Sequence, residues 1–130
     1  MNDWPEWFPD ACPPAEARDA EGHFYRLVDG VEILESDFWS HEQEYLAGKR
    51  PRRSWSSGKL CDFVSCSIFA LRSDIEQTRK GVGPLKHKLV ALGDITGEGK
   101  LLETPTNGNS HHNWWRTQTE TAWVNFKVVE

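Results

Sequence analysis

The residues best suited to chemistry lie near the C-terminal end, in the sequence Ser-His-His-Asn-Trp-Trp over 110–115. His111 and His112 can each donate or accept a hydrogen bond, or carry a positive charge, near neutral pH. Trp114 and Trp115 each offer a flat apolar face with a single N–H donor. On a loop or at the mouth of a sheet, such a group can stack on a planar ligand and hydrogen-bond to its polar edges. The segment is therefore the first candidate for a ligand-binding site.

The two histidines are adjacent, so on a strand their side chains point to opposite faces. We expect one of His111 and His112 to face a pocket and the other to be satisfied within the protein or exposed. Trp114 and Trp115 should divide in the same way, one into the core and one toward a surface or cleft. Aromatic packing beside a turn is the alternative for the whole segment. A bare histidine pair matches no usual zinc pattern, so no metal site is predicted.

An arginine and a serine pair lie on two predicted strands elsewhere in the chain. Arg26 follows Tyr25 among apolar residues. An arginine within a strand is usually solvated or paired at an edge, but on a covered face its planar fork suits phosphate or carboxylate. Ser67 follows Cys66, and neither a G-x-S-x-G sequence nor a neighbouring base indicates a serine nucleophile. Cys66 is expected to be a small buried residue.

The elements that must position these residues follow from hydrophobic periodicity and turn signals. Strands are predicted at 23–28, 62–69, 86–95 and 122–129, and helices at 36–47 and 73–81. Ser36 is the expected N-cap of the first helix, and Ser73 with Glu76 is the expected capping box of the second. Gly97-Glu98-Gly99 predicts a tight hairpin turn. This order indicates an α+β fold, a single domain over 1–130 with a twisted, mainly antiparallel sheet and two short helices.

Two further segments have distinct compositions. Residues 1–22 hold four prolines among three aromatic residues, which predicts an extended N-terminal arm packed on the body. Residues 48–60 form a predicted basic loop with five bases and no acid. This loop suits a local phosphate or an acidic partner, and a solvated surface loop is the alternative. Because the net charge is −5, the surrounding body is strongly acidic, and no strong binding to duplex nucleic acid is expected.

The overall composition indicates a folded protein with an aromatic-rich core. The chain has 130 residues, seven tryptophans and six phenylalanines, against a mean hydropathy of −0.64. The three cysteines, Cys12, Cys61 and Cys66, form no C-x-x-C pair, so reduced thiols in a cytoplasmic protein are expected. No stretch approaches the ~20 apolar residues of a membrane span, and no membrane association is predicted.

Several short motifs resemble those of a set of small bacterial proteins. The motifs are a CPP element at 12–14, a YRLV strand at 25–28, a D-F-x-S helix start at 37–40, Ser-Ile-Phe at 67–69 and an S-H-x-x-W-W segment at 110–115. The resemblance covers most of the chain and implies one whole domain of bacterial origin. It carries no activity, but it marks the residues that the chemistry had already singled out.

Three shorter motifs resemble the Arg-Ser-Glu type ADP-ribosyltransferases. They are Arg26, then Ser-Cys-Ser at 65–67, then Gln-Thr-Glu at 118–120. In that family the arginine grips the cofactor phosphates, the serine strand shapes the NAD pocket and the final glutamate assists transfer. The resemblance implies NAD as a cofactor and Glu120 as a catalytic residue. The chain departs from the family at Cys66, where the family has threonine, and it is short for the fold.

Taken together, these residues predict a small cytoplasmic domain that binds a planar anionic ligand, with a nucleotide as the leading candidate and no reaction assigned. The predicted ligand-binding residues are Tyr25, Arg26, Ser67, His111, His112, Trp114 and Trp115. Arg26 would contact phosphate, a tryptophan would stack and a histidine would hydrogen-bond. One alternative is an NAD-using enzyme similar to the ADP-ribosyltransferases. The other is a protein-interaction module that uses exposed tryptophans and the basic loop to bind an acidic partner.

Overall fold

The computed structural model describes residues 4–10, 12–49, 60–105, 109–118 and 120–129. The strands are β1 (Arg18–Val28), β2 (Cys66–Phe69), β3 (Leu89–Glu103), β4 (His111–Trp115) and β5 (Lys127–Val128). The α-helices are α1 (His41–Leu46), α2 (Leu60–Phe63) and α3 (Arg72–Gly81). Short 3-10 turns lie at η1 (Glu35–Phe38), η3 (Gly83–Leu85) and η4 (Ala122–Asn125). The described part of the chain holds no helix long and apolar enough to cross a membrane.

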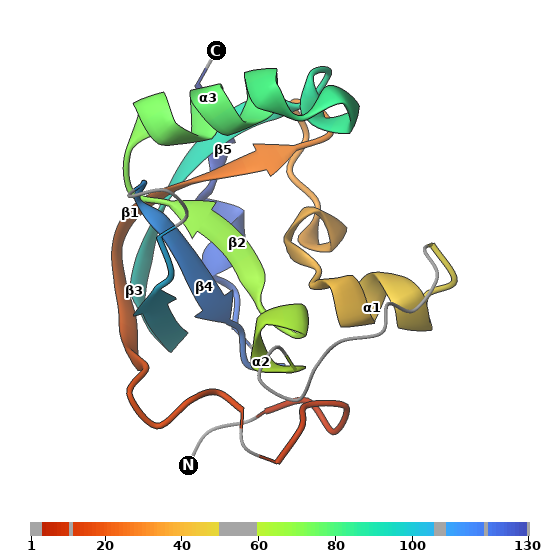
Figure 1. The fold of residues 1–130 in the computed structure, drawn as a ribbon, viewed down its shortest axis with the longest axis vertical. Helices are drawn as coiled ribbons and strands as arrows, with labels where there is room; N and C mark the ends of the chain where they lie inside the picture. Colours follow the sequence, from red (N-terminus) through yellow and green to blue (C-terminus); the bar gives the residue numbers. More distant parts are fainter. Residues whose placement is uncertain (1–3, 11, 50–59, 106–108, 119, 130) are drawn as a thin grey trace.

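The strands form one sheet that closes on itself like a small barrel (Figure 1). Their order is β1-β2-β4-β3-β5, and β1 also pairs with β3, which closes a ring of four strands. Each of the pairings between described strands is antiparallel. The predicted combination of helices with a mainly antiparallel sheet is therefore confirmed.

The long ladder between β1 and β3 is where the sheet coils. The predicted hairpin turn at 97–99 is wrong, because β3 continues through this segment. Gly97 and Gly99 adopt φ values of 92° and 84°, and the register shifts opposite them between Asp19 and Glu21. Closely spaced glycines are typical of a bulge as well as a turn, and the long partner strand selects the bulge.

The barrel interior is apolar and rich in aromatic residues, as predicted. Phe24 and Val28 of β1 and Trp114 of β4 point inward and are 4% exposed or less. Phe38 of η1 and Phe126 are also buried there, with ring centroids 4.8 Å apart. On β1, residues that alternate with this set face outward, as strand geometry requires.

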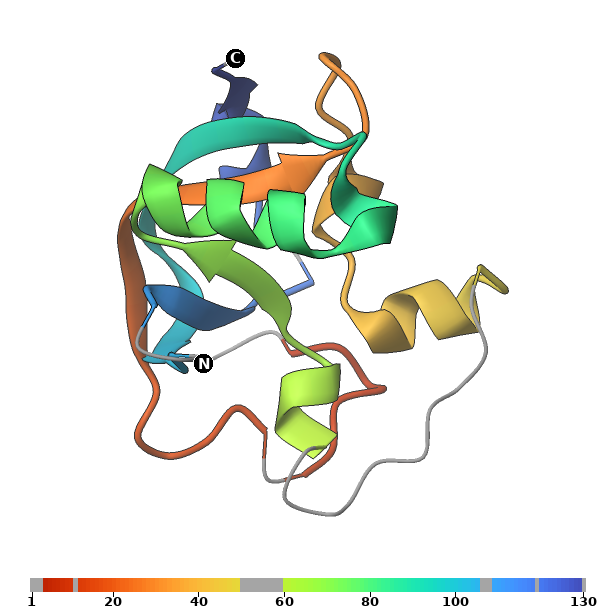
Figure 2. The ribbon, with the colours of Figure 1, turned by 45° about the horizontal axis from the view of Figure 1, so that its top comes forward.

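Helix α3 covers the outer face of the sheet over β1 and β2 (Figure 2). Ile75 is its buried residue and packs with Phe69 and Val90. The predicted helix is confirmed, but the capping box of Ser73 and Glu76 is wrong, since the helix begins at Arg72 and its N-cap makes no side-chain bond. Glu76 forms ion pairs with arginines of the same helix instead.

The helix predicted at 36–47 is divided into η1 and α1. Asp37 accepts hydrogen bonds from the backbone N–H groups of Asp29 and Leu34 at 3.2 and 2.9 Å, which holds η1 as a separate turn. The backbone is then extended at Trp39, and Ser40 becomes the N-cap of α1 by accepting from the N–H of Gln43. Ser36 is therefore not an N-cap, because tertiary hydrogen bonds at Asp37 outweigh local helix propensity.

Three predicted strand boundaries also differ from the structure. The strand at 62–69 is reduced to β2, because α2 occupies residues up to Phe63. The strand at 86–95 begins only at Leu89, after η3. The first half of the strand predicted at 122–129 is η4 instead, since the buried carboxylate of Glu120 accepts from the N–H of Ala122 at 2.6 Å and turns the chain. Val124, in the middle of this segment, is 55% exposed.

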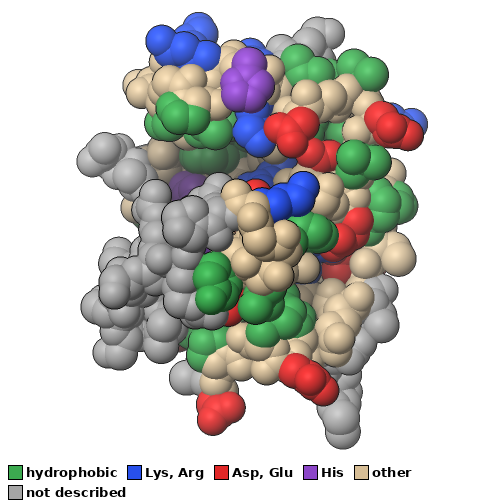
Figure 3. Space-filling model, turned by 90° about the vertical axis from the view of Figure 1, so that its right-hand side faces the viewer, with side chains coloured by type: hydrophobic (Ala, Val, Ile, Leu, Met, Phe, Trp, Pro, Cys, Tyr) green, Lys and Arg blue, Asp and Glu red, His purple; other side chains and the backbone are tan. Residues whose placement is uncertain are grey.

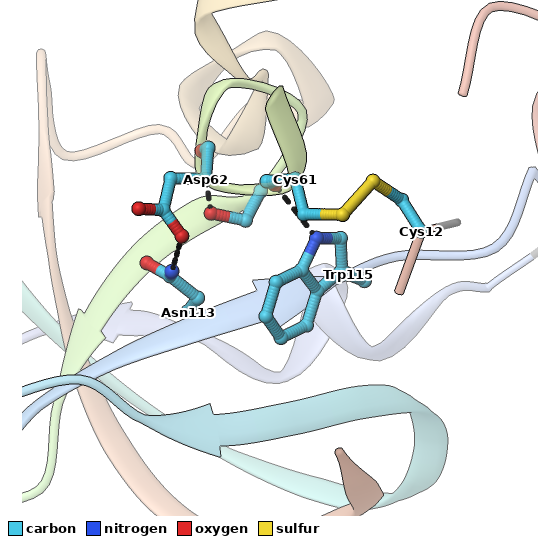
Figure 4. Close-up of a disulfide and its surroundings, with 6 residues drawn as sticks. Cys12, Cys61, Asp62, Asn113 and Trp115 are labelled. Atoms are coloured by element: carbon cyan, nitrogen blue, oxygen red, sulfur yellow. Dashed lines mark hydrogen bonds between the residues drawn. A yellow bond between two sulfur atoms is a disulfide. The ribbon is translucent and has the colours of Figure 1, made fainter. Parts of the chain in front are cut away.

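The expectation of three reduced thiols is wrong, because Cys12 and Cys61 form a disulfide (Figure 4). Their Cα atoms lie 5.3 Å apart although 49 residues separate them, so no sequence spacing signals the pair. Trp115 is fully buried beside the bridge and donates its indole N–H to the carbonyl of Cys61 at 2.8 Å. Cys66 is a free, buried cysteine, as predicted.

The N-terminal residues that the structure describes meet this disulfide. Trp4, Trp7 and Phe8 are partly buried against the cluster of Cys12 and Trp115. Residues 18–22, predicted to end the arm, belong to β1 instead. Of the predicted basic loop, residues 50–59 lie outside the described residues. The Lys49 ammonium lies 5.6 Å from the centre of the Trp39 ring.

Candidate functional site

Arg26 joins three elements at the point where β1 and β2 separate. Tyr25 of β1 is opposite Phe69 of β2, and Arg26 is the next residue along β1. Its Nε donates to the carbonyl of Asp37 at 3.0 Å, and one terminal nitrogen donates to the carbonyl of Ser67 at 2.8 Å. The rigid guanidinium fork therefore holds η1 and β2 in fixed positions relative to β1.

The charge of Arg26 has no carboxylate partner within the described part of the chain. Its hydrogen bonds go to neutral carbonyls, and its carbon Cζ lies 6.0 Å from the centre of the Phe38 ring. Nearby, Lys88 is neutralised by Asp29 at 2.8 Å, and this ion pair lowers the pKa of the Asp29 carboxyl. Arg26 thus supplies an uncompensated positive charge at a partly buried position.

Ser67 and His111 meet across the ladder of β2 and β4. Ser67 is opposite Asn113, and His111 is opposite Phe69, which places Ser67 and His111 diagonally on the outer face. Ser67 Oγ lies 2.9 Å from His111 Nε2. On the other side of the ring, His111 Nδ1 lies 3.0 Å from the carbonyl oxygen of Thr104 and 2.8 Å from its hydroxyl.

These contacts assign the tautomer of His111. A carbonyl oxygen can only accept, so Nδ1 carries the hydrogen and donates it to Thr104. Nε2 then holds a lone pair and accepts the hydroxyl hydrogen of Ser67. Burial lowers the pKa of the His111 imidazole, and the hydrogen bond to the Thr104 backbone only partly opposes this shift. The ring is therefore neutral near pH 7, as an acceptor at Nε2 requires.

Arg26, Ser67 and His111 line one cavity of about 310 Å³, which we call the Arg26 cavity. Its walls come from β1, β2, β4, α1 and α3, and Trp39, Phe69 and Lys88 are among its other lining residues. Among the described residues that line it, Glu44 is the single acid. On the side of the molecule that carries α1, the surface is hollowed near its middle, and Lys and Arg side chains lie at this hollow (Figure 3).

The remaining residues of the predicted ligand site lie elsewhere. His112 is 6% exposed inside the barrel, where its ring packs on Phe24 and its Nδ1 donates to the carbonyl of Ser110 at 2.7 Å. The prediction that one histidine faces a pocket while the other is satisfied within the protein is confirmed. Tyr25 packs on the outer face with the α3 cluster, outside the cavity lining.

Both tryptophans of the 110–115 segment are fully buried. Trp114 lies in the barrel and donates its indole N–H to the carbonyl of Glu98 at 3.0 Å, and Trp115 lies beside the disulfide. They point to opposite faces, as adjacent strand residues must. Neither is exposed at the surface, whereas Trp114 is among the residues that line a cavity together with Arg116 and Glu120. Trp114 is covered by the other residues of the barrel interior, and Trp115 is covered on the outer face by N-terminal residues.

Glu120 belongs to a second cavity of about 410 Å³. Its carboxylate is fully buried and forms an ion pair with Arg116, which also pairs with Glu35 at 2.5 Å and donates to the carbonyl of Phe38 at 3.0 Å. Burial is the largest single influence and works against the charge of Arg116, but attraction to Glu120, Cys66 and Glu35, together with the hydrogen bond to Glu120, raises the pKa of the guanidinium. Glu120 does not line the cavity that holds Arg26 and Ser67.

Sequence reasoning missed two residues that line the Arg26 cavity, Trp39 and Lys88, and also Thr104, which contacts the ring of His111. Trp39, Lys88 and Thr104 carry no motif, and each reaches the site through sheet register or helix packing. A strand serine and a strand histidine were both visible in the sequence, but their contact spans 44 residues. The described residues also contain no cluster of three or more potential metal ligands.

Comparison with known proteins finds no protein family, no curated protein and no solved structure that matches this chain.

Proposed function

We propose that the Arg26 cavity binds a small planar anionic ligand, with a nucleotide as the leading candidate. The observation that carries the proposal is the uncompensated charge of Arg26 in a partly buried cavity. A phosphate or carboxylate there gains a charge-assisted hydrogen bond at low local dielectric. Lys88 and neutral His111 line the same space and offer further polar contacts.

The ring that could stack on a planar ligand is that of Trp39, and not that of Trp114 or Trp115 as predicted. Trp114 and Trp115 are 0% exposed and have no face free for a ligand. Trp39 lines the Arg26 cavity and is only partly buried, with its indole N–H donated to Glu35 at 2.7 Å. This hydrogen bond orients the ring, so a planar base has an anchored aromatic surface beside Arg26 and Lys88.

The two alternatives have less support from the geometry. For NAD-using transfer, Glu120 would have to reach Ser67, but it lines the other cavity and is paired with Arg116. For a protein-interaction module, exposed tryptophans are needed, and none of the six that the structure describes is in an exposed position. That the protein is bacterial and cytoplasmic stays a prediction. The disulfide between Cys12 and Cys61 is more typical of proteins in an oxidising compartment than of cytoplasmic ones.

A matched pair of lysine variants tests the proposal. Lys88 and Lys100 are each 28% exposed and each pairs with an exposed aspartate, at 2.8 and 2.7 Å, but only Lys88 lines the cavity. Lys88→Gln and Lys100→Gln therefore remove equivalent ion pairs. Thermal unfolding is measured with AMP, ATP, NAD and inorganic tripolyphosphate, and dissociation constants follow by calorimetry.

We expect at least one nucleotide to raise the melting temperature, by the equivalent of ~2.7 kcal/mol at a hundredfold excess over Kd. Lys88→Gln should weaken that binding by about tenfold or more, the usual loss for a hydrogen bond to a charged group, and Lys100→Gln should not. Tripolyphosphate separates charge from stacking, since it lacks a base. An absence of any shift, or equal weakening in both variants, would show that the cavity is not an anion site.

A further inference from the structure

We propose that Ser67 and His111 are a nucleophile and general base that hydrolyse an ester in the Arg26 cavity. The proposal stands on three aligned groups from three places in the chain: Ser67 Oγ, the His111 ring and the Thr104 carbonyl. The hydroxyl donates to Nε2 at 2.9 Å, and Nδ1 lies 3.0 Å from the carbonyl oxygen. In serine hydrolases, a histidine accepts the hydrogen bond of the nucleophilic hydroxyl, and an acceptor on the far side of the ring binds its other nitrogen. Ser67, His111 and Thr104 have the same arrangement.

Ser67 is accessible where its neighbours are not. Cys66, Ile68 and Phe69 are all buried, whereas Ser67 is exposed and lines the cavity. Its backbone is held by the 2.8 Å hydrogen bond from Arg26 to its carbonyl, and β4 holds the opposite side through the ladder. The hydroxyl is therefore presented to the cavity from a rigid strand, with its base already in contact.

The Thr104 carbonyl holds the ring in the tautomer that the reaction needs. With the hydrogen on Nδ1, Nε2 is free to take the proton of Ser67 as its oxygen attacks. When the ring becomes an imidazolium, the same carbonyl stabilises the charge on Nδ1. The ring of Phe69, 5.2 Å from that of His111, restricts its rotation.

The reaction balances with water as the second substrate. Ser67 Oγ attacks the carbonyl carbon of the ester while His111 Nε2 takes the hydroxyl proton. The carbon–oxygen bond to the alcohol breaks, and the alcohol leaves with the proton from His111, which produces an acyl-serine. Water then attacks the acyl carbon, His111 takes a proton from it and returns this proton to Ser67 Oγ, and a carboxylic acid is released.

The substrate class that we assign rests on the proposed function, whereas the assignment of Ser67 as the nucleophile does not. Arg26 and Lys88 line the cavity beside Ser67, so the ester would carry a carboxylate or phosphate on its acyl or alcohol part. A neutral reagent avoids this dependence. Phenylmethylsulfonyl fluoride reacts at activated serines by loss of fluoride and needs no anion site, so a failure of nucleotide binding leaves this test intact.

The experiment measures the rate of sulfonylation by intact mass and locates the adduct by peptide mapping. The full-length wild type is compared with Ser67→Ala, His111→Gln and the control Ser73→Ala, which removes an exposed serine on α3 that does not line the cavity. We expect one adduct, at Ser67, in the wild type and in Ser73→Ala. It should be absent in Ser67→Ala and form roughly a hundredfold or more slowly in His111→Gln, the range for a lost general base.

The pH dependence of the labelling rate is measured on the wild type alone, so this test does not depend on whether the variants fold. The labelling rate should fall as the pH drops through the folded pKa of His111, which burial places below its usual value, and should level off above it. An unlabelled Ser67 under excess reagent would overturn the proposal. So would equal rates in the wild type and a folded His111→Gln protein, or a rate that rises tenfold per pH unit through neutrality without a plateau.

Discussion

Replacing both Cys12 and Cys61 by alanine should destabilise the protein by about 4 kcal/mol. The bridge closes a loop across a sequence separation of 49 residues. For a loop of that size, the loss of chain entropy in the unfolded state is worth ~4 kcal/mol at room temperature. This is a large share of the ~5–15 kcal/mol that holds a typical domain together, and it corresponds to a fall in melting temperature on the order of 15 °C.

The assay is urea unfolding followed by tryptophan fluorescence, on protein equilibrated with oxidised glutathione. Reductant should destabilise the wild type by the same ~4 kcal/mol and should leave the double variant unchanged. The slope of the free energy against urea should rise when the bridge is absent, because the unfolded chain then exposes more surface. Cys66→Ala is the matched control, since it removes a buried sulfur without a cross-link and should cost only ~1–2 kcal/mol.

Thiol counting gives an independent check on the same protein. Of the three cysteines, only Cys66 is free, so alkylation in denaturant should modify one thiol before reduction and three after it. Three modified thiols in the oxidised protein would refute the pairing. A loss below ~1 kcal/mol in the double variant would instead refute the entropic argument, and would mean that the unfolded chain is already compact around this loop.

Two further predictions concern single residues. Gly99→Ala should lower the free energy of unfolding in urea by roughly 2–4 kcal/mol, because its φ of 84° suits glycine and the new Cβ would lie 2.3 Å from the carbonyl oxygen of Trp115. The control is Gly81→Ala, whose Cβ would meet nothing within 4 Å. Equal effects of the two substitutions would refute a tight contact of β3 with β4. The stability of the wild type should fall as the pH drops from about 6.5 through the folded pKa of His111. Burial lowers that pKa, so the unfolded state binds more protons in this window. Urea titrations between about pH 5 and 8 should show a shallower dependence for His111→Gln, and parallel curves would contradict a depressed pKa.

Local pattern was enough to predict some of the elements. The run of residues from His23 to Val28 predicted the second half of β1, and the segment from Ser73 to Gly81 predicted α3, although the expected cap is absent. Adjacent histidines on a strand had to point to opposite faces, and they do. These predictions depend only on local residue patterns, which can be read directly from the sequence.

Where a tertiary contact competes with a local preference, the sequence alone was misleading. The glycines at 97 and 99 indicated a turn, but pairing with β1 keeps the strand running. The alternation over 122–129 indicated a strand, but the buried carboxylate of Glu120 turns the chain at Ala122. In each case the deciding partner lies outside the window that the pattern describes.

The candidate site belongs almost entirely to the tertiary structure. Ser67 and His111 were recognised separately, yet their contact depends on the register of β2 against β4, and a slip of one residue would turn Ser67 to the other face. Arg26 reaches the carbonyl of Ser67 across 41 residues, and the disulfide spans 49. The sequence determined which residue types were available and indicated strands for Arg26 and Ser67, but it did not predict β4, which carries His111. Only the closure of the sheet decided which of them meet, because register is set by the packing of the whole barrel and not by any local segment.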